Sequence, residues 1–360
     1  MRYKKRNTTL QSSLSDMDID GILVTCPENI TYLTGMEGVE GIYCTYSGGG
    51  VLFTDFRYIN AVKEKDCSIE TMECRELIKD IAQWLAQHGL RRIGFESRNI
   101  TVDTHRQLTD ALSSVTLVPC ADCVEQLRLI KDKDEQELIR TSARILGEVM
   151  DQVPGIIGNT SGITERDLAV EMDYMMKKAG AQRSAFEIII ATDERSAFPH
   201  SSPTNRAIGQ ARSILVDCGA VFQGYHSDMT RVMAMKPPRE EKMRDVYEVV
   251  REAQRAAMDK VSPGACARDI DGAARKVISD AGFEAYFGHG TGHGVGLMIH
   301  EEPRISAKSD TIVREGMIFT IEPGIYLEHA FGIRWEDMVV VTEGGCESLT
   351  AIKWDSLEVL

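Results

Sequence analysis

An internal repeat in the C-terminal part of the chain constrains its fold more than any other feature. Residues 162–168 (GITERDL) align with residues 264–270 (GACARDI) at an offset of 102 positions, the difference between 162 and 264. Residues 179–180 and 281–282, Ala-Gly in both cases, match at the same offset. Because glycine commonly follows the last turn of a helix, each copy is predicted to contain a helix that ends at its glycine. The repeat predicts two similarly folded halves.

The first half is predicted to contain a β-hairpin that carries two acidic residues. Residues 213–220 and 227–234 have the apolar content of strands, with a turn near residues 223–224 (QG) between them. Asp217 and Asp228 stand where a core strand would hold apolar side chains. Their midpoint lies within about one residue of the turn, so the two carboxylates are expected nearly opposite each other, an arrangement that destabilises a sheet.

The second half is predicted to contain a similar hairpin. Its strands are residues 317–322 and 332–340, joined through residues 323–324 (PG), and its acidic residues are Glu322 and Glu336. If the two halves face each other, the four carboxylates converge. At roughly 5 Å and an effective dielectric constant of about 20, each like-charged pair costs about 3 kcal/mol, and six pairs approach about 20 kcal/mol. This exceeds the usual net stability of a domain. Protons or two divalent cations must therefore neutralise the cluster, although each acid taken singly is also explained as a strand end or a cap.

Residues 287–303 add imidazole to these acids. His289, His293 and His300 fall within twelve positions, and glycine occupies every second position from 288 to 296. Alternating glycine leaves the backbone open to close approach by a ligand or another strand, and a flexible loop with surface histidines is the alternative. Neutral histidine is a common metal ligand. Oxygen-rich ligation with a single imidazole favours manganese, iron(II) or cobalt over a closed, sulfur-rich zinc site.

The first third of the chain alternates strands and helices in the manner of an α/β domain. The predicted elements are residues 21–25, 41–45, 51–54, 77–88, 92–96 and 104–112. The pattern then changes, and residues 125–150 are predicted to form one or two charged amphipathic helices. We therefore expect a first domain of residues 1–122 and a second of residues 123–360.

Composition and charge argue against several classes of protein. The formal net charge of −14 opposes binding to a polyanion, so no nucleic-acid partner is expected. No run approaches the roughly 18 apolar residues of a membrane span, and polar residues follow the basic N-terminus, so no membrane partner or signal peptide is expected. The nine scattered cysteines do not form a pattern typical of a secreted disulfide protein. A cytoplasmic protein with reduced thiols is expected.

Six motifs resemble the motif series of the metallopeptidases that include aminopeptidase P and prolidase. They are residues 217–220 (DCGA), 226–231 (HSDMTR), 289–297 (HGTGHGVGL), 300–301 (HE), 322–324 (EPG) and 332–337 (GIRWED). The resemblance is strong over the C-terminal part and weak over the first domain, where it rests on residues 29–35 (NITYLTG) and 54–58 (TDFRY). It implies an α/β (α+β) "pita-bread" catalytic domain with pseudo-twofold symmetry, preceded by a smaller creatinase-type α/β domain.

The resemblance also implies a role for each candidate site residue. Its pattern gives three sets of residues: the metal ligands Asp217, Asp228, His293, Glu322 and Glu336, the catalytic residues Glu322, His300 and His200, and the substrate-side His289. Arg304 and Arg334 are added as substrate-binding residues from their positions in the chain. Two divalent ions are implied, manganese first, with cobalt, iron and zinc as alternatives. Arg304 would clamp a C-terminal carboxylate or else be a surface salt-bridge residue. Arg334 shares a strand face with Glu336 and is expected to orient it.

The implied reaction is hydrolysis of the N-terminal Xaa-Pro bond of small peptides with proline in second position. The compact, two-domain length favours Xaa-Pro aminopeptidase activity, with Xaa-Pro dipeptidase (prolidase) activity as the alternative. Methionine aminopeptidase ranks third, because it usually lacks such an N-terminal domain. A non-catalytic binding protein on the same fold would be expected to have lost a ligand, and all five are present here. A homodimer is implied by the resemblance alone.

Overall fold

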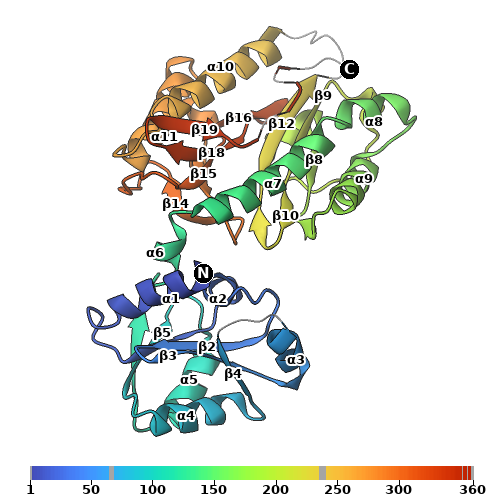
Figure 1. The fold of residues 1–360 in the computed structure, drawn as a ribbon. Helices are drawn as coiled ribbons and strands as arrows, with labels where there is room; N and C mark the ends of the chain where they lie inside the picture. The colour runs from blue at the N-terminus through green and yellow to red at the C-terminus, as the bar shows by residue number, and fades with distance from the viewer. Residues whose placement is uncertain (1, 65–68, 235–240, 351, 355, 358–360) are drawn as a thin grey trace. The chain divides into compact units, whose positions relative to one another are not determined.

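The computed structural model describes residues 2–64, 69–234, 241–350, 352–354 and 356–357 (Figure 1). The chain forms two compact units, Met1–Arg128 and Leu129–Leu360, and each has its own hydrophobic core. Among the described helices, none combines the length and the apolar character that crossing a membrane would require.

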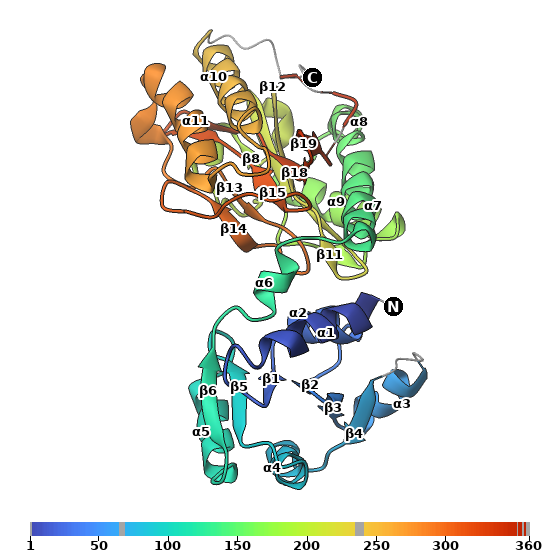
Figure 2. The ribbon, with the colours of Figure 1, turned by 60° about the vertical axis from the view of Figure 1, so that its left-hand side comes forward.

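The first unit is a six-stranded mixed sheet with helices on both faces (Figure 2). The strands, in the order β4-β3-β2-β1-β5-β6, are β1 Gly21–Val24, β2 Gly41–Tyr46, β3 Gly49–Thr54, β4 Glu70–Glu73, β5 Arg92–Glu96 and β6 Thr116–Cys120. The helices are α1 Arg2–Ser13, α2 Pro27–Thr34, α3 Phe56–Glu64, α4 Leu77–Gln87, α5 Val102–Ala111 and α6 Glu125–Arg128. The six elements predicted here are confirmed, with ends displaced by no more than two residues.

Hydrogen bonds fasten the end of the first unit to α2. The Asn29 Nδ2 amide donates to Glu125 Oε1 at 2.7 Å, and Arg128 Nη1 donates to Asn29 Oδ1 at 2.7 Å. These bonds hold α6 with the first unit. The units consequently divide after residue 128, whereas the sequence pattern places the boundary after residue 122.

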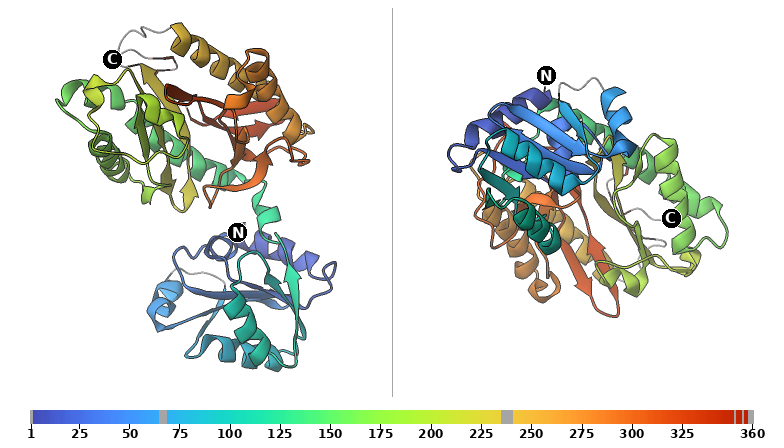
Figure 3. Two further views of the ribbon diagram at one scale, coloured as in Figure 1. Left: turned by 180° about the vertical axis from the view of Figure 1, so that it is seen from behind. Right: turned by 90° about the horizontal axis from the view of Figure 1, so that it is seen from below.

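The second unit repeats one arrangement of helices. Helices α9 and α11 each have 14 residues, and Ala267 follows Glu165 by 102 positions, so the predicted duplication is confirmed. Helices α7 and α10 each have 18 residues. Helices α8–α9 flank the strands of one half and α10–α11 those of the other (Figures 1 and 3). The helices are α7 Lys133–Met150, α8 Val153–Asn159, α9 Glu165–Lys178, α10 Glu241–Met258 and α11 Ala267–Asp280.

Short strands fill the space between these helices. The first half contains β7 Arg183–Ser184, β8 Ile189–Thr192, β9 Ser213–Cys218, β10 Ala220–Phe222, β11 Tyr225–His226 and β12 Met229–Ala234. The second half contains β13 Gly292–Gly294, β14 Glu301–Ile305, β15 Ile318–Ile321, β16 Gly324–Leu327, β17 Phe331–Arg334, β18 Asp337–Thr342 and β19 Gly345–Ser348. Two sheets carry the acidic residues, and their strand orders are β12-β9-β8 and β14-β13-β15-β18-β19.

The first acidic hairpin turns where predicted, at residues 223–224, but the residue opposite Asp217 lies two positions beyond Asp228. Strands β9 and β12 pair with Asp217 opposite Thr230, and the pairing is centred between Gln223 and Gly224. Both turn residues have positive φ, 46° and 81°, as a tight two-residue hairpin turn requires. Asp217 and Asp228, expected nearly opposite each other, are therefore close across the hairpin but not directly opposed. They are diagonal neighbours on adjacent strands.

The second acidic hairpin turns later than predicted. Strand β15 pairs with β18, and β16 pairs with β17, so the chain continues as strand past residues 323–324 and turns after Leu327. Ile321 lies opposite Asp337 and Gly324 opposite Arg334, which places Glu322 and Glu336 across from each other in the break between the two ladders. The Glu336 amide donates to the Thr230 carbonyl at 3.2 Å and joins this hairpin to the first.

Candidate active site

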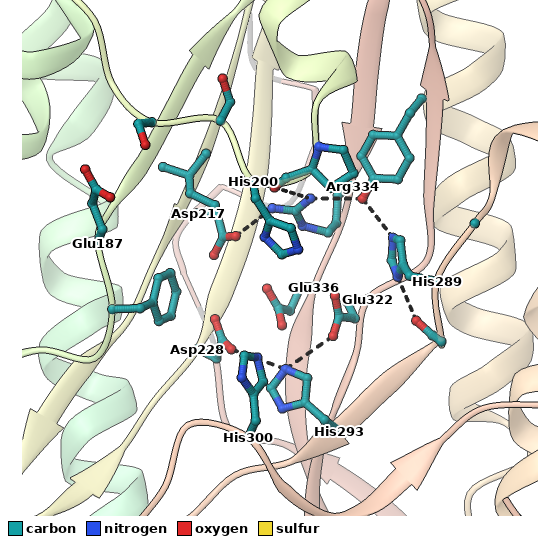
Figure 4. Close-up of a pocket in the computed structure, with 18 of the residues that line it drawn as sticks. Glu187, His200, Asp217, Asp228, His289, His293, His300, Glu322, Arg334 and Glu336 are labelled. Atoms are coloured by element: carbon teal, nitrogen blue, oxygen red, sulfur yellow. Dashed lines mark hydrogen bonds and ion pairs between the residues drawn. The ribbon is translucent and has the colours of Figure 1, made fainter.

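A cavity of about 880 Å³ lies within the second unit (Figure 4). It is lined by all ten residues to which the sequence analysis assigns a role, namely His200, Asp217, Asp228, His289, His293, His300, Arg304, Glu322, Arg334 and Glu336. The two halves contribute together: β9 and the segment before β12 bring Asp217 and Asp228, while the second hairpin brings Glu322 and Glu336. Their individual roles stay predictions.

Glycines explain how the imidazole reaches the acids. His293 is the middle residue of β13, which runs between β14 and β15. A Cβ at Gly292 would lie 1.9 Å from the Thr320 carbonyl oxygen, and one at Gly294 would lie 2.2 Å from that of Glu302. No other residue type fits so close a backbone approach. The alternating glycines therefore seat the His293 strand between its neighbours.

The imidazole and the acids converge on one point. Atoms of Asp228, His293 and Glu336 lie within 4.8 Å of one another. His293 Nε2 lies 3.4 Å from Glu322 Oε1 and 3.7 Å from Asp228 Oδ2. His293 Nδ1 lies 3.2 Å from the Gly294 carbonyl oxygen, which only accepts, so Nδ1 carries the proton and Nε2 presents a lone pair to the acids.

Burial shifts the pKa of each of these groups toward its neutral form. Burial lowers the pKa of His293 to about 4, so the ring is neutral at pH 7. Burial, followed by the charges of neighbouring carboxylates, raises the pKa of Asp228 and Glu336 well above the usual range. Burial also raises the pKa of Glu322. Without a positive charge between them, the acids repel one another and resist ionisation.

Asp217 is held at the edge of this cluster by a buried arginine. Arg334 Nη2 donates to Asp217 Oδ2 at 2.6 Å, and Arg334 Nε donates to Thr230 Oγ1 at 3.1 Å. The sequence analysis expects Arg334 to orient Glu336. Instead, the Thr230 hydroxyl donates to Glu336 Oε2 at 2.6 Å, and Arg334 orients Asp217. The reason is that Thr230, and not Asp228, lies opposite Asp217, so Arg334 donates to both Thr230 and Asp217.

The donor set fits divalent cations. Within the described residues, the buried Oδ1 of Asp217 has no hydrogen-bond partner, although Oδ2 of the same group is fully engaged. Ligand atoms about 2.1 Å from one ion lie up to about 4.2 Å apart, which matches the separations of His293 from Asp228 and Glu322. Carboxylate oxygens and one imidazole nitrogen can bind manganese, iron(II), cobalt or zinc. Because oxygen ligands outnumber the single nitrogen, the first three are favoured.

His289 is bound on both sides by the protein. Its Nδ1 lies 2.7 Å from the Gly290 carbonyl oxygen and its Nε2 lies 2.9 Å from the Tyr326 hydroxyl. Because the carbonyl requires a proton on Nδ1, Nε2 accepts the Tyr326 proton, and Arg334 Nη1 donates to that hydroxyl at 2.9 Å. Burial lowers the pKa of His289, which keeps it neutral. The ring therefore has no N–H left for the substrate-binding role assigned from the sequence.

Three further predicted residues line the cavity with exposed side chains. His200 follows Pro199 in the loop between β8 and β9, and His300 packs edge-to-face on His293 with ring centroids 4.4 Å apart. Arg304 lies opposite His293 in the β13–β14 ladder and so shares its face of the sheet. No carboxylate of the described residues pairs with the Arg304 guanidinium.

Comparison with known proteins places this site in a family. The model of metallopeptidase family M24 matches residues 137–343, and the model of the creatinase/prolidase N-terminal domain matches residues 6–130. The chain belongs to metallopeptidase family M24. It is accordingly a metallopeptidase with the fold that its sequence predicts, a pseudo-twofold pita-bread domain preceded by a creatinase-type domain.

Named relatives of this M24 protein act on proline peptides. A protein of Pyrococcus horikoshii named Xaa-Pro dipeptidase is 33% identical over 92% of this chain and 93% of its own. The solved structure of an Xaa-Pro dipeptidase from Bacillus anthracis has a TM-score of 0.95 and 31% identity, and it covers 99% of this chain and 100% of that one. An X-Pro aminopeptidase from Thermotoga maritima has a TM-score of 0.88 and 31% identity, covering 97% and 100%.

Sequence reasoning missed two buried acids that hold the histidine-bearing segments of this M24 protein. Glu165 on α9 accepts hydrogen bonds from Thr192 and Thr204, which bracket the loop of His200. Asp271 on α11 accepts from the Thr291 amide and hydroxyl, beside His289. One signal was available. Each acid lies three and seven positions before buried apolar residues of the same helix, on its inward face.

Proposed function

We propose that this protein is an Xaa-Pro dipeptidase, which cleaves the bond before proline in dipeptides. The sequence alone favours aminopeptidase activity and keeps this activity as its alternative. The names of the P. horikoshii and B. anthracis proteins support the alternative over the first choice. Because the similar T. maritima protein is named an aminopeptidase, the shared fold does not by itself decide between the two activities.

We further propose that two divalent cations are held by Asp217, Asp228, His293, Glu322 and Glu336. The unpartnered Oδ1 of Asp217 and the lone pair of His293 support this assignment. When bound, such ions lower the pKa of water toward neutrality and polarise a carbonyl group. Manganese stays the first candidate, with cobalt, iron and zinc as alternatives.

Glu322 is the proposed proton carrier. It would accept a proton from the attacking water and deliver it to the proline nitrogen as the bond breaks. Its carboxylate lines the cavity close to His293, where a bound substrate and water would meet. The Thr320 hydroxyl donates to Oε1 at 3.1 Å and fixes the group, so we assign the proton transfer to Oε2.

His300 and His200 are the proposed donors to the oxyanion that develops on the scissile carbonyl. Partial burial beside His293, together with the nearby positive charge of Arg304, lowers the pKa of His300. Its ring is therefore neutral and offers one N–H, a donor already in place before the reaction. His200 enters from the first half of the unit, so the two rings reach the cavity from different segments.

The observation that carries the choice of a dipeptidase is the position of Arg304. Its guanidinium lines the cavity, beside His293 in register, without an acidic partner among the described residues. A guanidinium binds a carboxylate through two parallel hydrogen bonds. In a dipeptide the terminal carboxylate is on the proline itself, one residue from the scissile bond. In a longer peptide this position carries an amide, which offers Arg304 no charge.

The test compares Leu-Pro with Leu-Pro-amide and Leu-Pro-Gly on manganese-loaded protein. We expect the dipeptide to have the largest kcat/KM. Arg304→Met should raise KM for Leu-Pro about 10- to 100-fold, the range for a hydrogen bond to a charged group, and leave Leu-Pro-amide unchanged. Arg314→Met, at an exposed arginine outside the cavity, is the matched control. Faster cleavage of Leu-Pro-Gly would favour the aminopeptidase, and inactivity on all three would remove both activities.

A further inference from the structure

The cavity contains another carboxylate, outside the cation cluster. Glu187 precedes β8 in the first half of the second unit, and its exposed side chain lines the cavity. Neither a hydrogen bond nor an ion pair to any described residue engages its carboxylate. Figure 4 shows Glu187 beyond Asp217, on the side of the cavity opposite His289. The carboxylate is therefore available to a cationic group on a bound molecule.

The residues around Glu187 are apolar. Phe186 and Ile189 line the same cavity, Phe186 half-buried and Ile189 buried. The Phe186 ring packs against Gly219, where an added Cβ would lie 3.0 Å from its Cε1 atom, so this wall is tightly fixed. An apolar wall beside an acidic group complements lysine and arginine, whose methylene stems pack on apolar surface while the charged end reaches a polar partner.

The proposed dipeptidase function determines the orientation of the dipeptide in the cavity. If Arg304 of the second half binds the proline carboxylate and the cation cluster holds the scissile bond, the first residue extends away from Arg304. The first half supplies part of the remaining cavity wall, and Glu187 lies there with Phe186 and Ile189. Glu187 thus offers a negative charge to the side chain of the first residue.

We propose that Glu187 is a specificity-determining residue that selects dipeptides with lysine or arginine before proline. This inference rests on the proposed dipeptidase function. The net charge of −14 attracts every cationic substrate, so the local contribution of Glu187 must be separated from the overall charge.

The experiment measures kcat/KM for Lys-Pro and Met-Pro, two substrates with long unbranched side chains that differ in charge. We expect the wild-type protein to prefer Lys-Pro. An exposed ion pair contributes modestly, so Glu187→Gln should lower the Lys-Pro to Met-Pro ratio about three- to fivefold. Glu343→Gln, at an exposed acid outside the cavity, changes the net charge equally and should leave the ratio unchanged. Glu187→Lys should shift the preference toward Glu-Pro.

The outcomes separate this inference from the proposed function. Hydrolysis of both dipeptides with a ratio that Glu187→Gln does not change would overturn the role of Glu187 and leave the dipeptidase in place. An equal loss of the ratio in Glu343→Gln would assign the preference to overall charge and overturn the inference as well. A protein inactive on all Xaa-Pro dipeptides would overturn both.

Discussion

Replacing Glu165 by glutamine should destabilise the loop that carries His200. Glu165 is fully buried at the start of α9. Its Oε1 accepts from the Thr192 amide and hydroxyl at 2.9 and 2.7 Å. Its Oε2 accepts from the Thr204 amide and hydroxyl at 3.0 and 2.6 Å, and from Arg195 Nε at 3.3 Å. The Glu165 carboxylate thus binds both ends of the loop that carries His200, at Thr192 and at Thr204.

The size of the destabilisation follows from the hydrogen bonds that the glutamine amide can no longer accept. In Glu165→Gln an NH₂ group replaces one oxygen, so at least one backbone amide is left donor against donor and the threonine hydroxyl beside it must become an acceptor, which removes at least two of the five hydrogen bonds to a charged group. At a lower bound of roughly 1.5 kcal/mol for each hydrogen bond to a charged group, the free energy of unfolding falls by about 3 kcal/mol. Burial alone would raise the pKa of Glu165, but the bonds from Thr204 and Thr192 lower it. The stabilisation is therefore present above the unfolded pKa of about 4.3 and is lost as the pH falls through the folded value.

Urea unfolding followed by tryptophan fluorescence measures this effect, since Trp335 is buried in the core of the same unit. Glu171→Gln removes the same charge from an exposed position of α9 and is the control. We also expect kcat/KM to fall because His200 is displaced, while manganese affinity is kept. A loss of stability below about 1 kcal/mol, equal to that of the control, would refute the reasoning.

Two further predictions concern the acidic cluster. Because the pKa values of Asp228, Glu322 and Glu336 are raised in the folded protein, the metal-free protein should lose stability as the pH rises from about 4.3 toward these values. Melting temperatures from pH 5 to pH 8 in EDTA should show this decline, and saturating Mn²⁺ should remove it. Thr230→Val deletes the donor to Glu336 and should weaken Mn²⁺ binding about 10- to 100-fold, whereas an unchanged affinity would make this hydrogen bond irrelevant to the ligand.

Much of the fold was predictable because local patterns determine it. The helix stops at Gly180 and Gly282 have positive φ in the structure, and the repeat they mark organises the whole second unit. The acids on the strands were recognisable because a carboxylate in a core strand requires compensation. These signals are contained within short segments of the chain.

The remaining features depend on register and on distant contacts. The turn at residues 223–224, predicted from the sequence, pairs Thr230 with Asp217, and Arg334 donates to Asp217 and not to Glu336. The choice of Asp217 by Arg334 joins residues 117 positions apart, which no local pattern determines. The pairing of His289 with Tyr326 likewise joins residues 37 positions apart, and nothing in either segment predicts it.

The central claim is that acids from two hairpins and one imidazole form a site for two divalent cations. Calorimetric titration of the metal-free protein with Mn²⁺ tests it most directly. Two ions should bind per chain, and Asp217→Asn should remove one of them, because the buried Oδ1 of Asp217 accepts no hydrogen bond from the part of the chain that the structure describes. Binding of fewer than one ion per chain, or two ions that bind equally well to Asp217→Asn, would contradict the account.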